Sequence, residues 1–416
     1  MSILDLEKAL KSNINLEECT CVTDGHPMYI ATDIGSTTQR TILFSPPGDM
    51  QSAPVKMGTS FCSVPSEADY SYCMGASNSI IDNLDLEIHC SNPNENTFVR
   101  DMRIVKGSLL NRLNLSEREL TSDASKVDSV GMYVNILCNI SVLMLAERVT
   151  NKESLSEIQE IDVTVALPPD DANIADRVRL FKSRLMGSYS VVFNRLGVTV
   201  RFNIDAKNIY TGSEPLGAAL YRIMADDDID TETNCGFLDC GGRSSGTIFF
   251  VDGVLKEGSS YAFPIGGVSL LDALADRIAE INHIQRPRLE AMYKVLETGI
   301  YKYGGQKLQV ADAITEAKKT VAEELFNGLS RGLALNKLQA VDLERVYCSG
   351  RTFGVTQSDT GNVLSQSVCT FLKQLFREKS PSTEFIRECD DTAVVKGMVY
   401  VRMRYPYNSA SGAMSV

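Results

Sequence analysis

Two short segments of the chain carry acidic, glycine and hydroxyl residues at the same spacing. The first runs from Asp33 to Phe44 and the second from Asp239 to Phe250, and five of the twelve aligned positions are identical. Glycine lets the backbone approach a ligand closely, and the amides and hydroxyls that follow it can donate to one anion. A leading Asp can hold a hydrated Mg2+ against phosphate oxygens. These residue types predict a polyphosphate clamp with one half in each segment.

Each segment follows a short apolar run and precedes another, which is the pattern of a strand, a turn of small residues and a second strand. A single Asp-x-Gly turn is common between strands and indicates no function by itself. Two copies in register favour the clamp over a purely structural turn. The candidate clamp residues are Asp33, Gly35, Ser36, Thr37 and Thr38 in the first copy and Asp239, Gly241, Gly242, Arg243 and Ser244 in the second.

Glu214 lies where a strand is expected to end and a helix of small residues to begin. Ser213 is placed to cap this helix, and Pro215 suits its first turn. The helix dipole would keep the Glu214 carboxylate ionised and make it a weak base. If Glu214 faces the clamp, its natural task is to orient an attacking water. The alternative, that Glu214 only complements the helix end, is equally open.

Other segments could also approach a nucleotide. Gly266 and Gly267 run into a helix and could bring the backbone to a ribose or to phosphates. Lys294, on a helix expected over residues 289–300, could reach a ribose or an adenine edge. A strand that starts at Arg345 opens into a glycine turn at Gly350. The chain lacks the Gly-Lys-Ser/Thr loop and the Gly-x-Gly-x-x-Gly pattern, so Walker and Rossmann interpretations lack their signature residues.

Composition sets limits on function. A chain of 416 residues predicts two or three domains. The net charge of -12 disfavours direct binding to nucleic acid or to an anionic membrane. Eleven cysteines and three histidines show no metal-binding spacing, so we expect free thiols in a reducing cytosol. No membrane span is expected, because the apolar segment 132–146 is too short and too interrupted.

The remaining segments are expected to be structural. Residues 1–27 begin with a short amphipathic pattern, and residues 50–125, rich in Ser, Asn and Asp, suit a small inserted subdomain. Residues 127–149 have the apolar spacing of a core helix, and residues 161–169 form a strand stopped by prolines. The acidic residues 226–232 favour an exposed linker over a calcium loop.

In the order of these segments, the chain resembles the actin-like ATPase superfamily, and most closely the bacterial plasmid-segregation actins of the ParM type. The likeness covers about residues 28–402. It implies an α/β fold of two lobes with a nucleotide cleft between them. Lobe I would comprise residues 28–211 and 385–416, with the subdomain inserted at about 50–125, and lobe II residues 212–384. Residues 1–27 would be an N-terminal extension.

The resemblance also implies residue roles. Arg40 stands where actin and ParM carry a lysine that touches the β- and γ-phosphates, and Glu214 matches the glutamate that positions the hydrolytic water. Two positions depart from the family pattern: Gly246 replaces a second Asp, and Arg351 replaces a second Gly, which leaves ATP against GTP open. The candidate catalytic and metal-shell residues are therefore Asp33, Asp239 and Glu214, and Arg40, Gly266, Gly267, Lys294, Ser349, Gly350 and Arg351 join the clamp residues as nucleotide-binding candidates.

The function that the resemblance implies is a cytoplasmic ATPase that uses ATP, or GTP in its place, with Mg2+. It would polymerise into nucleotide-dependent filaments and move DNA through a DNA-bound, ParR-like adaptor, without touching nucleic acid or membrane itself. Two alternatives stay open: a metabolic kinase or ATP-driven enzyme activator of the same superfamily, and a cell-shape or organelle-positioning actin. A chaperone is disfavoured, because no substrate-binding region follows the expected ATPase.

Overall fold

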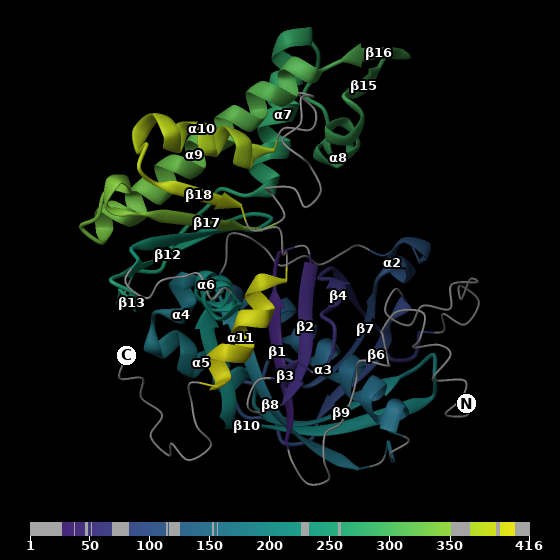
Figure 1. Cartoon of the computed structure of the whole chain (residues 1–416). Coiled ribbons are helices and arrows are strands. Elements are labelled where there is room, and N and C mark those ends of the chain that lie inside the picture. Colours follow the sequence, from purple (N-terminus) through teal and green to yellow (C-terminus); the bar gives the residue numbers. More distant parts are fainter. Residues whose placement is uncertain are drawn as a thin grey trace. The chain divides into compact units, whose positions relative to one another are not determined.

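The computed structural model describes residues 27–36, 38–45, 49–50, 52–68, 83–113, 115, 125–151, 154–155, 157–225, 233–256, 259–350, 367–387 and 392–403. The chain divides into two compact units (Figure 1). Unit 1 comprises Met1–Tyr221 and Val394–Val416, and unit 2 comprises Arg222–Ala393. Thr37, Arg351, the acidic segment 226–232 and nearly all of the expected N-terminal extension lie outside the described residues.

Unit 1 is built on one large sheet. Its strands are β1 (Met28–Ile34), β2 (Thr38–Ser45), β3 (Asp49–Met50), β4 (Val55–Gly58), β5 (Phe61–Val64), β6 (Asp85–Cys90), β7 (Asp101–Lys106), β8 (Ile158–Leu167), β9 (Gly187–Phe193) and β10 (Val198–Ser213). Its helical segments are α2 (Ser108–Arg112), η4 (Lys126–Asp128), α3 (Val130–Asn151), α4 (Pro169–Ala172), α5 (Ala175–Leu185), most of α6 (Glu214–Ala225) and α11 (Ala393–Met403).

The strands of this sheet follow the order β3-β2-β1-β8-β10-β9-β6-β7-β5, with β4 paired to β2. Strands β1, β8 and β10 run parallel to one another, and β2 is antiparallel to β1. The segment 50–125, expected to form a small subdomain, supplies strands at both sides of the sheet, because β6 pairs with β9 while β4 pairs with β2. The central strands are almost wholly buried, as their apolar, β-branched sequences predict.

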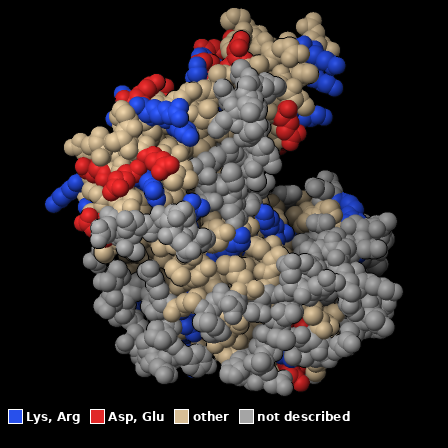
Figure 2. Space-filling model, in the orientation of Figure 1, with Lys and Arg blue, Asp and Glu red and all other residues tan. Residues whose placement is uncertain are grey.

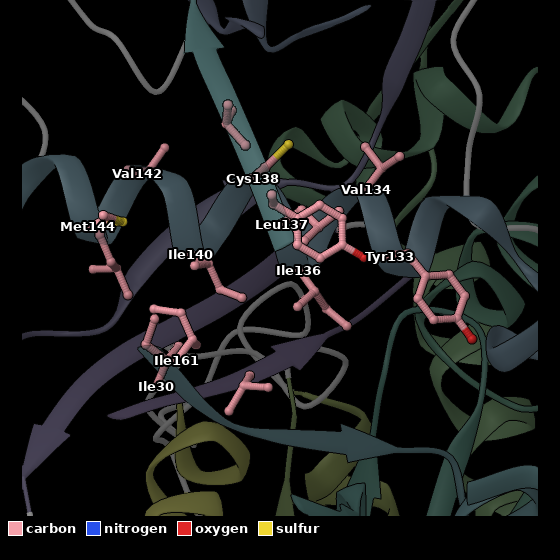
Figure 3. Packing of buried hydrophobic residues seen from close by; sticks show 14 of the residues in the cluster. Ile30, Tyr133, Val134, Ile136, Leu137, Cys138, Ile140, Val142, Met144 and Ile161 are labelled. Atoms are coloured by element: carbon pink, nitrogen blue, oxygen red, sulfur yellow. The ribbon is translucent and has the colours of Figure 1, made fainter. Parts of the chain in front are cut away.

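Helices α3 and α11 cover opposite faces of this sheet. Side chains alternate along β1, so Thr32 and Tyr29 point to different faces. On one face, Asn139 of α3 donates to the Thr32 hydroxyl at 3.1 Å. On the other, Arg402 of α11 lies 5.7 Å from the Tyr29 ring centroid and forms a bidentate pair with Asp162 of β8. Figure 3 shows the α3 side of this core, where helix side chains pack over the strand residues.

Helix α3 is long and apolar enough to cross a membrane by length and composition, over Val130–Thr150. The expectation that the apolar segment, taken as residues 132–146, is too short to cross a membrane was therefore wrong about its length. However, 94% of the most apolar window is buried inside the protein. Near the start of α3, the rings of Phe98 and Phe181 lie 5.2 and 5.7 Å from that of Tyr133. This burial identifies α3 as the core helix of unit 1.

Unit 2 contains a second sheet and a small separate hairpin. Its strands are β11 (Cys235–Cys240), β12 (Ser245–Val251), β13 (Val254–Leu255), β14 (Tyr261–Phe263), β15 (Ile300–Tyr303), β16 (Gln306–Gln309), β17 (Arg345–Ser349) and β18 (Glu384–Arg387). Its helical segments are α7 (Gly267–Asn282), α8 (Leu289–Thr298), α9 (Ala311–Leu335), η5 (Ala340–Asp342) and α10 (Val368–Lys379). Helices α7, α9 and α10 bury their apolar sides in the core of this unit.

The two sheets share one strand order. Unit 2 has β13-β12-β11-β17-β18 with β14 on β12, which matches β3-β2-β1-β8-β10 with β4 on β2 in unit 1. In both, an antiparallel hairpin is followed by two strands that run parallel to its first strand. The repeat visible in twelve residues of sequence is therefore part of a repeat of about five strands.

Candidate functional site

The first half of the candidate site is the turn between β1 and β2. The Gly35 amide donates to the Thr38 carbonyl at 3.1 Å and closes the turn. Asp33 lies opposite Arg40 across the hairpin, and Arg40 Nη1 is 3.3 Å from Asp33 Oδ2. Both side chains are mostly buried, as are the strands that carry them. The sequence therefore places a compensated carboxylate directly beside the expected phosphate turn.

The second half is the turn between β11 and β12, and the equivalent backbone hydrogen bond closes it. The Gly241 amide donates to the Ser244 carbonyl at 2.9 Å. Asp239 lies opposite Gly246, the position that corresponds to Arg40. Without a cation there, Asp239 accepts a hydrogen bond at 2.8 Å from the Ser349 hydroxyl, on the neighbouring parallel strand β17. The aligned residues of the two segments thus occupy equivalent places in equivalent hairpins.

Glu214 belongs to the first half-site. Strand β10 ends at Ser213, whose hydroxyl accepts from the Leu216 amide at 3.3 Å, so the predicted helix cap is confirmed. Lys126 forms an ion pair with Glu214 Oε1 and donates to the Ile34 carbonyl at 2.8 Å. Ile34 is the last residue of β1 before the turn. Glu214 is therefore held beside the hairpin that carries Asp33.

Burial raises the pKa of Glu214, whereas a position at a helix N-terminus would by itself lower it. Desolvation raises the pKa of its carboxyl above the usual value, Lys126 acts in the opposite direction, and the Asp33 and Asp171 charges raise the pKa further. The sequence had favoured the helix dipole as the dominant influence, which would have weakened Glu214 as a base. In the folded chain, desolvation is the larger effect.

Lys126 was missed in the sequence. It lies in the 3-10 turn η4. The Ser125 hydroxyl caps this turn by accepting a hydrogen bond from the Val127 amide at 3.2 Å. A Ser before a short turn and an apolar helix is an N-cap signal, so the turn could have been predicted. The role of Lys126 could not, because its two partners lie 88 and 92 residues away in the chain.

A series of hydrogen bonds connects the first turn to buried polar residues of unit 1. The Thr59 hydroxyl donates to the Ser36 carbonyl at 2.9 Å. The Thr59 carbonyl in turn accepts from Asn135 of α3 at 3.1 Å and from Lys106 of β7 at 3.4 Å. These contacts tie the expected phosphate turn to the core helix.

In unit 2, helix α7 docks on the second turn through its N-terminus. The amides of Gly267 and Val268 donate to the carbonyls of Gly241 and Gly242, at 3.1 and 2.7 Å. These two amides are engaged within the protein, so Gly266 and Gly267 act here by allowing close packing. A Cβ on Gly266 would lie 2.8 Å from the backbone of Arg243.

The remaining nucleotide-binding candidates differ in their surroundings. Ser349 lies beside Asp239, and Gly350 follows it with φ +108 at a point where a Cβ would lie 2.1 Å from the Cys240 carbonyl oxygen. Lys294 is exposed on α8, and its side chain forms no hydrogen bond or ion pair within the described part of unit 2. The structure therefore brings Ser349 and Gly350 to the second hairpin but leaves Lys294 on a solvent-facing side of its helix.

The donor set of the first half-site fits a nucleotide with Mg2+. Asp33 and Glu214 offer carboxylate oxygens, which Mg2+ prefers, and Arg40 offers a cation for phosphate, while Lys126 is engaged with Glu214. Among the described residues, no three His, Cys, Asp or Glu side chains gather as a metal-binding group.

Comparison with known proteins identifies the fold. No family model and no curated protein matches the chain. Among solved structures, it is similar to Ta0583, an archaeal actin homologue, with 12% identity, TM-score 0.62, and coverage of 91% of this chain and 100% of the other. A 15-stranded ParM filament from Clostridium botulinum matches with 13% identity, TM-score 0.60, and coverage of 91% and 99%. Bacillus thuringiensis ParM with ATP matches with 15% identity, TM-score 0.55, and coverage of 91% and 98%.

The chain therefore has an α/β actin-like fold, as the order of its sequence segments predicted. Within that class, ParM proteins and an archaeal actin homologue are structural neighbours of this chain.

Proposed function

We propose that the chain is an ATPase that binds one nucleoside triphosphate with Mg2+ and polymerises into filaments. The observation that carries the proposal is the pair of matching hairpins, one in each unit of an actin-like fold, each led by an aspartate and closed by the same backbone hydrogen bond. Structural neighbours of the chain include a ParM solved with ATP and an actin homologue solved with ADP.

In this proposal each half-site has a distinct task. Asp33 and Asp239 would hold the water shell of Mg2+, which would neutralise phosphate charge. Arg40 leaves Asp33 for the β- and γ-phosphates, and the amides and hydroxyls of both turns donate to phosphate oxygens. Glu214 orients the attacking water, and its raised pKa, caused chiefly by burial, makes it able to accept a proton as the water attacks.

Filament formation is the second part of the proposal. A neighbour with the same fold was solved as a filament. Head-to-tail contacts that do not close on themselves generate an open helix of subunits. If both hairpins bind the same nucleotide, loss of its γ-phosphate releases one set of contacts, and hydrolysis then times the disassembly of the polymer.

Sedimentation combined with electron microscopy tests this function. The protein should pellet as filaments with ATP and Mg2+, and phosphate release should accompany assembly. Without nucleotide, or with Mg2+ removed by a chelator, the pellet should be lost. Turnover that requires an added small metabolite and yields no polymer would instead identify a metabolic kinase of the same fold.

We further propose that the filament moves DNA in the cytoplasm through a DNA-bound adaptor. The net charge of -12 opposes direct contact with DNA phosphates. On the face drawn in Figure 2, positive and negative side chains alternate over the described surface of unit 2, without a continuous basic area. Filaments mixed with plasmid DNA alone should therefore pellet without it. Co-pelleting of bare DNA at physiological salt would contradict the need for an adaptor.

A further inference from the structure

Lys126 joins two parts of the first half-site that come from distant positions in the chain. Its ammonium group pairs with Glu214 Oε1 and donates to the Ile34 carbonyl at 2.8 Å. The side chains of Lys126 and Glu214 are each 16% exposed, so the pair is largely shielded from water but still reachable. A single cation thus fixes the Glu214 carboxylate relative to the hairpin.

The turn that carries Lys126 is itself fixed by ionic contacts. Asp128, two residues further on, accepts from Arg177 and from Arg184 of α5 at 2.7 Å each. Arg177 also donates to Asp171 of α4 at 3.0 Å. The η4 turn is therefore tied to α5 directly and to α4 through Arg177. These contacts fix the backbone of Lys126 and so the position from which its side chain extends to Glu214.

We propose that Lys126 is a positioning residue for hydrolysis: it holds the Glu214 side chain beside the hairpin, where that side chain orients the attacking water. The inference rests on the proposed function, since it needs a triphosphate at the hairpin. Lys126 acts through Glu214, and the affinity for nucleotide does not depend on it.

The charged groups around Glu214 agree with a positioning role for this cation. Asp33 on β1 and Asp171 on α4 bring further negative charge to the surroundings of the Glu214 carboxyl. Arg40 on β2 is paired with Asp33. Lys126 is the cation that contacts Glu214 directly, and its second contact, to the Ile34 carbonyl, ties that carboxyl to the end of β1.

The test compares Lys126→Met, which removes the charge at similar volume, with Lys126→Arg, which keeps it. ATP turnover is measured over a range of ATP concentrations, and the affinities for ATP and ADP are measured separately. We expect Lys126→Met to lower kcat about ten- to a hundredfold with ATP affinity nearly unchanged. Lys126→Arg, which keeps a cation that can contact both the Glu214 carboxyl and the Ile34 carbonyl, should restore most of kcat.

A double-mutant cycle with Glu214→Gln separates this role from a merely structural one. In the Glu214→Gln background, Lys126→Met should cause no further fall in kcat, because both changes remove the same interaction. Lys207→Met serves as the matched control, since Lys207 is an exposed lysine paired only with Asp205 within the described residues.

Two results would overturn the inference. One is ATP affinity weakened in Lys126→Met by as large a factor as kcat, which would make Lys126 a phosphate ligand. The other is a further large fall in kcat in the double variant. A wild-type protein that neither binds nor hydrolyses nucleotide would instead refute the proposed function, so the two failures are distinguishable.

Discussion

At the scale of single residues, the buried lysine beneath the first turn has a measurable effect on stability. Lys106 is 2% exposed, and burial lowers the pKa of its ammonium group to about 8. The unfolded chain holds this proton up to about pH 10.5. Burying the charge therefore costs about 3 kcal/mol below pH 8, at about 1.4 kcal/mol per pKa unit, and this cost disappears as the pH rises toward 10.5.

Lys106→Met should remove that pH dependence. Between pH 8 and pH 10, the free energy of unfolding of the wild type should increase by about 2 kcal/mol relative to that of the Met variant. Urea unfolding at several pH values measures the difference, and Lys207→Met provides an exposed control. A constant difference between wild type and Lys106→Met across this range would show that the pKa of Lys106 is the same in the folded protein as in the unfolded chain.

Local chemistry decided which site residues could be predicted. Asp33 and Asp239 lead turns whose pattern is contained within a dozen residues, and Glu214 follows a capping serine. The partners of Lys126 are brought to it only by the sheet. The pKa of Glu214 was misjudged for the same reason, because burial is a property of the whole fold and leaves no local signature.

At the scale of elements, Gly350 follows β17 and lies against Cys240, the last residue of β11. Its φ of +108 is unfavourable for other residues, and an added Cβ would lie 2.1 Å from the Cys240 carbonyl oxygen. Gly350→Ala should therefore lower the free energy of unfolding by more than about 2 kcal/mol.

Gly304→Ala is the matched control for this substitution. Gly304 has φ +54 in the turn between β15 and β16, with open space around its Cβ position, so only backbone strain is introduced, at about 1 kcal/mol. Thermal or urea unfolding compares the two variants. Equal destabilisation would mean that the contact with Cys240 relaxes without cost.

Elements with long apolar sequences were predictable, and strand partners were not. The core helix expected over residues 127–149 is α3, Val130–Asn151, and the strand expected before the prolines is β8. The strands within 50–125 escaped recognition as part of the main sheet. Their sequences are polar at alternate positions, and β6 finds its partner β9 only about a hundred residues later.

At the scale of the molecule, the two aspartates of the hairpins test whether both units bind the same ligand. At a hundredfold excess of MgATP over its Kd, the wild type should be stabilised by about 2.7 kcal/mol. Asp33→Ala and Asp239→Ala should each lose most of this stabilisation, although the residues belong to different units. Differential scanning calorimetry measures the shift, and titration calorimetry should give one nucleotide per chain.

Asp205→Ala, at an exposed carboxylate of β10, is the control for these variants. A full ligand-induced shift in either hairpin variant would exclude that hairpin from the nucleotide site.

The fold class was predictable because motif order survives where sequence identity does not. The neighbours are 11 to 15% identical to this chain, yet they cover about nine-tenths of it. The repeat of the whole strand order could not be seen in the sequence, because only the turns must keep their residue types. The strands need only remain apolar.

The matching hairpins share a backbone hydrogen bond but place their arginines differently. In the first copy Arg40 lies across the hairpin from Asp33, whereas in the second the aligned position is Gly246 and the arginine, Arg243, stands in the turn, so that Asp239 accepts from a serine hydroxyl. Each copy therefore carries one acidic and one basic residue of the same total charge in a different arrangement. A duplicated frame can thus acquire two distinct charge patterns by moving a single cationic side chain three positions along the chain.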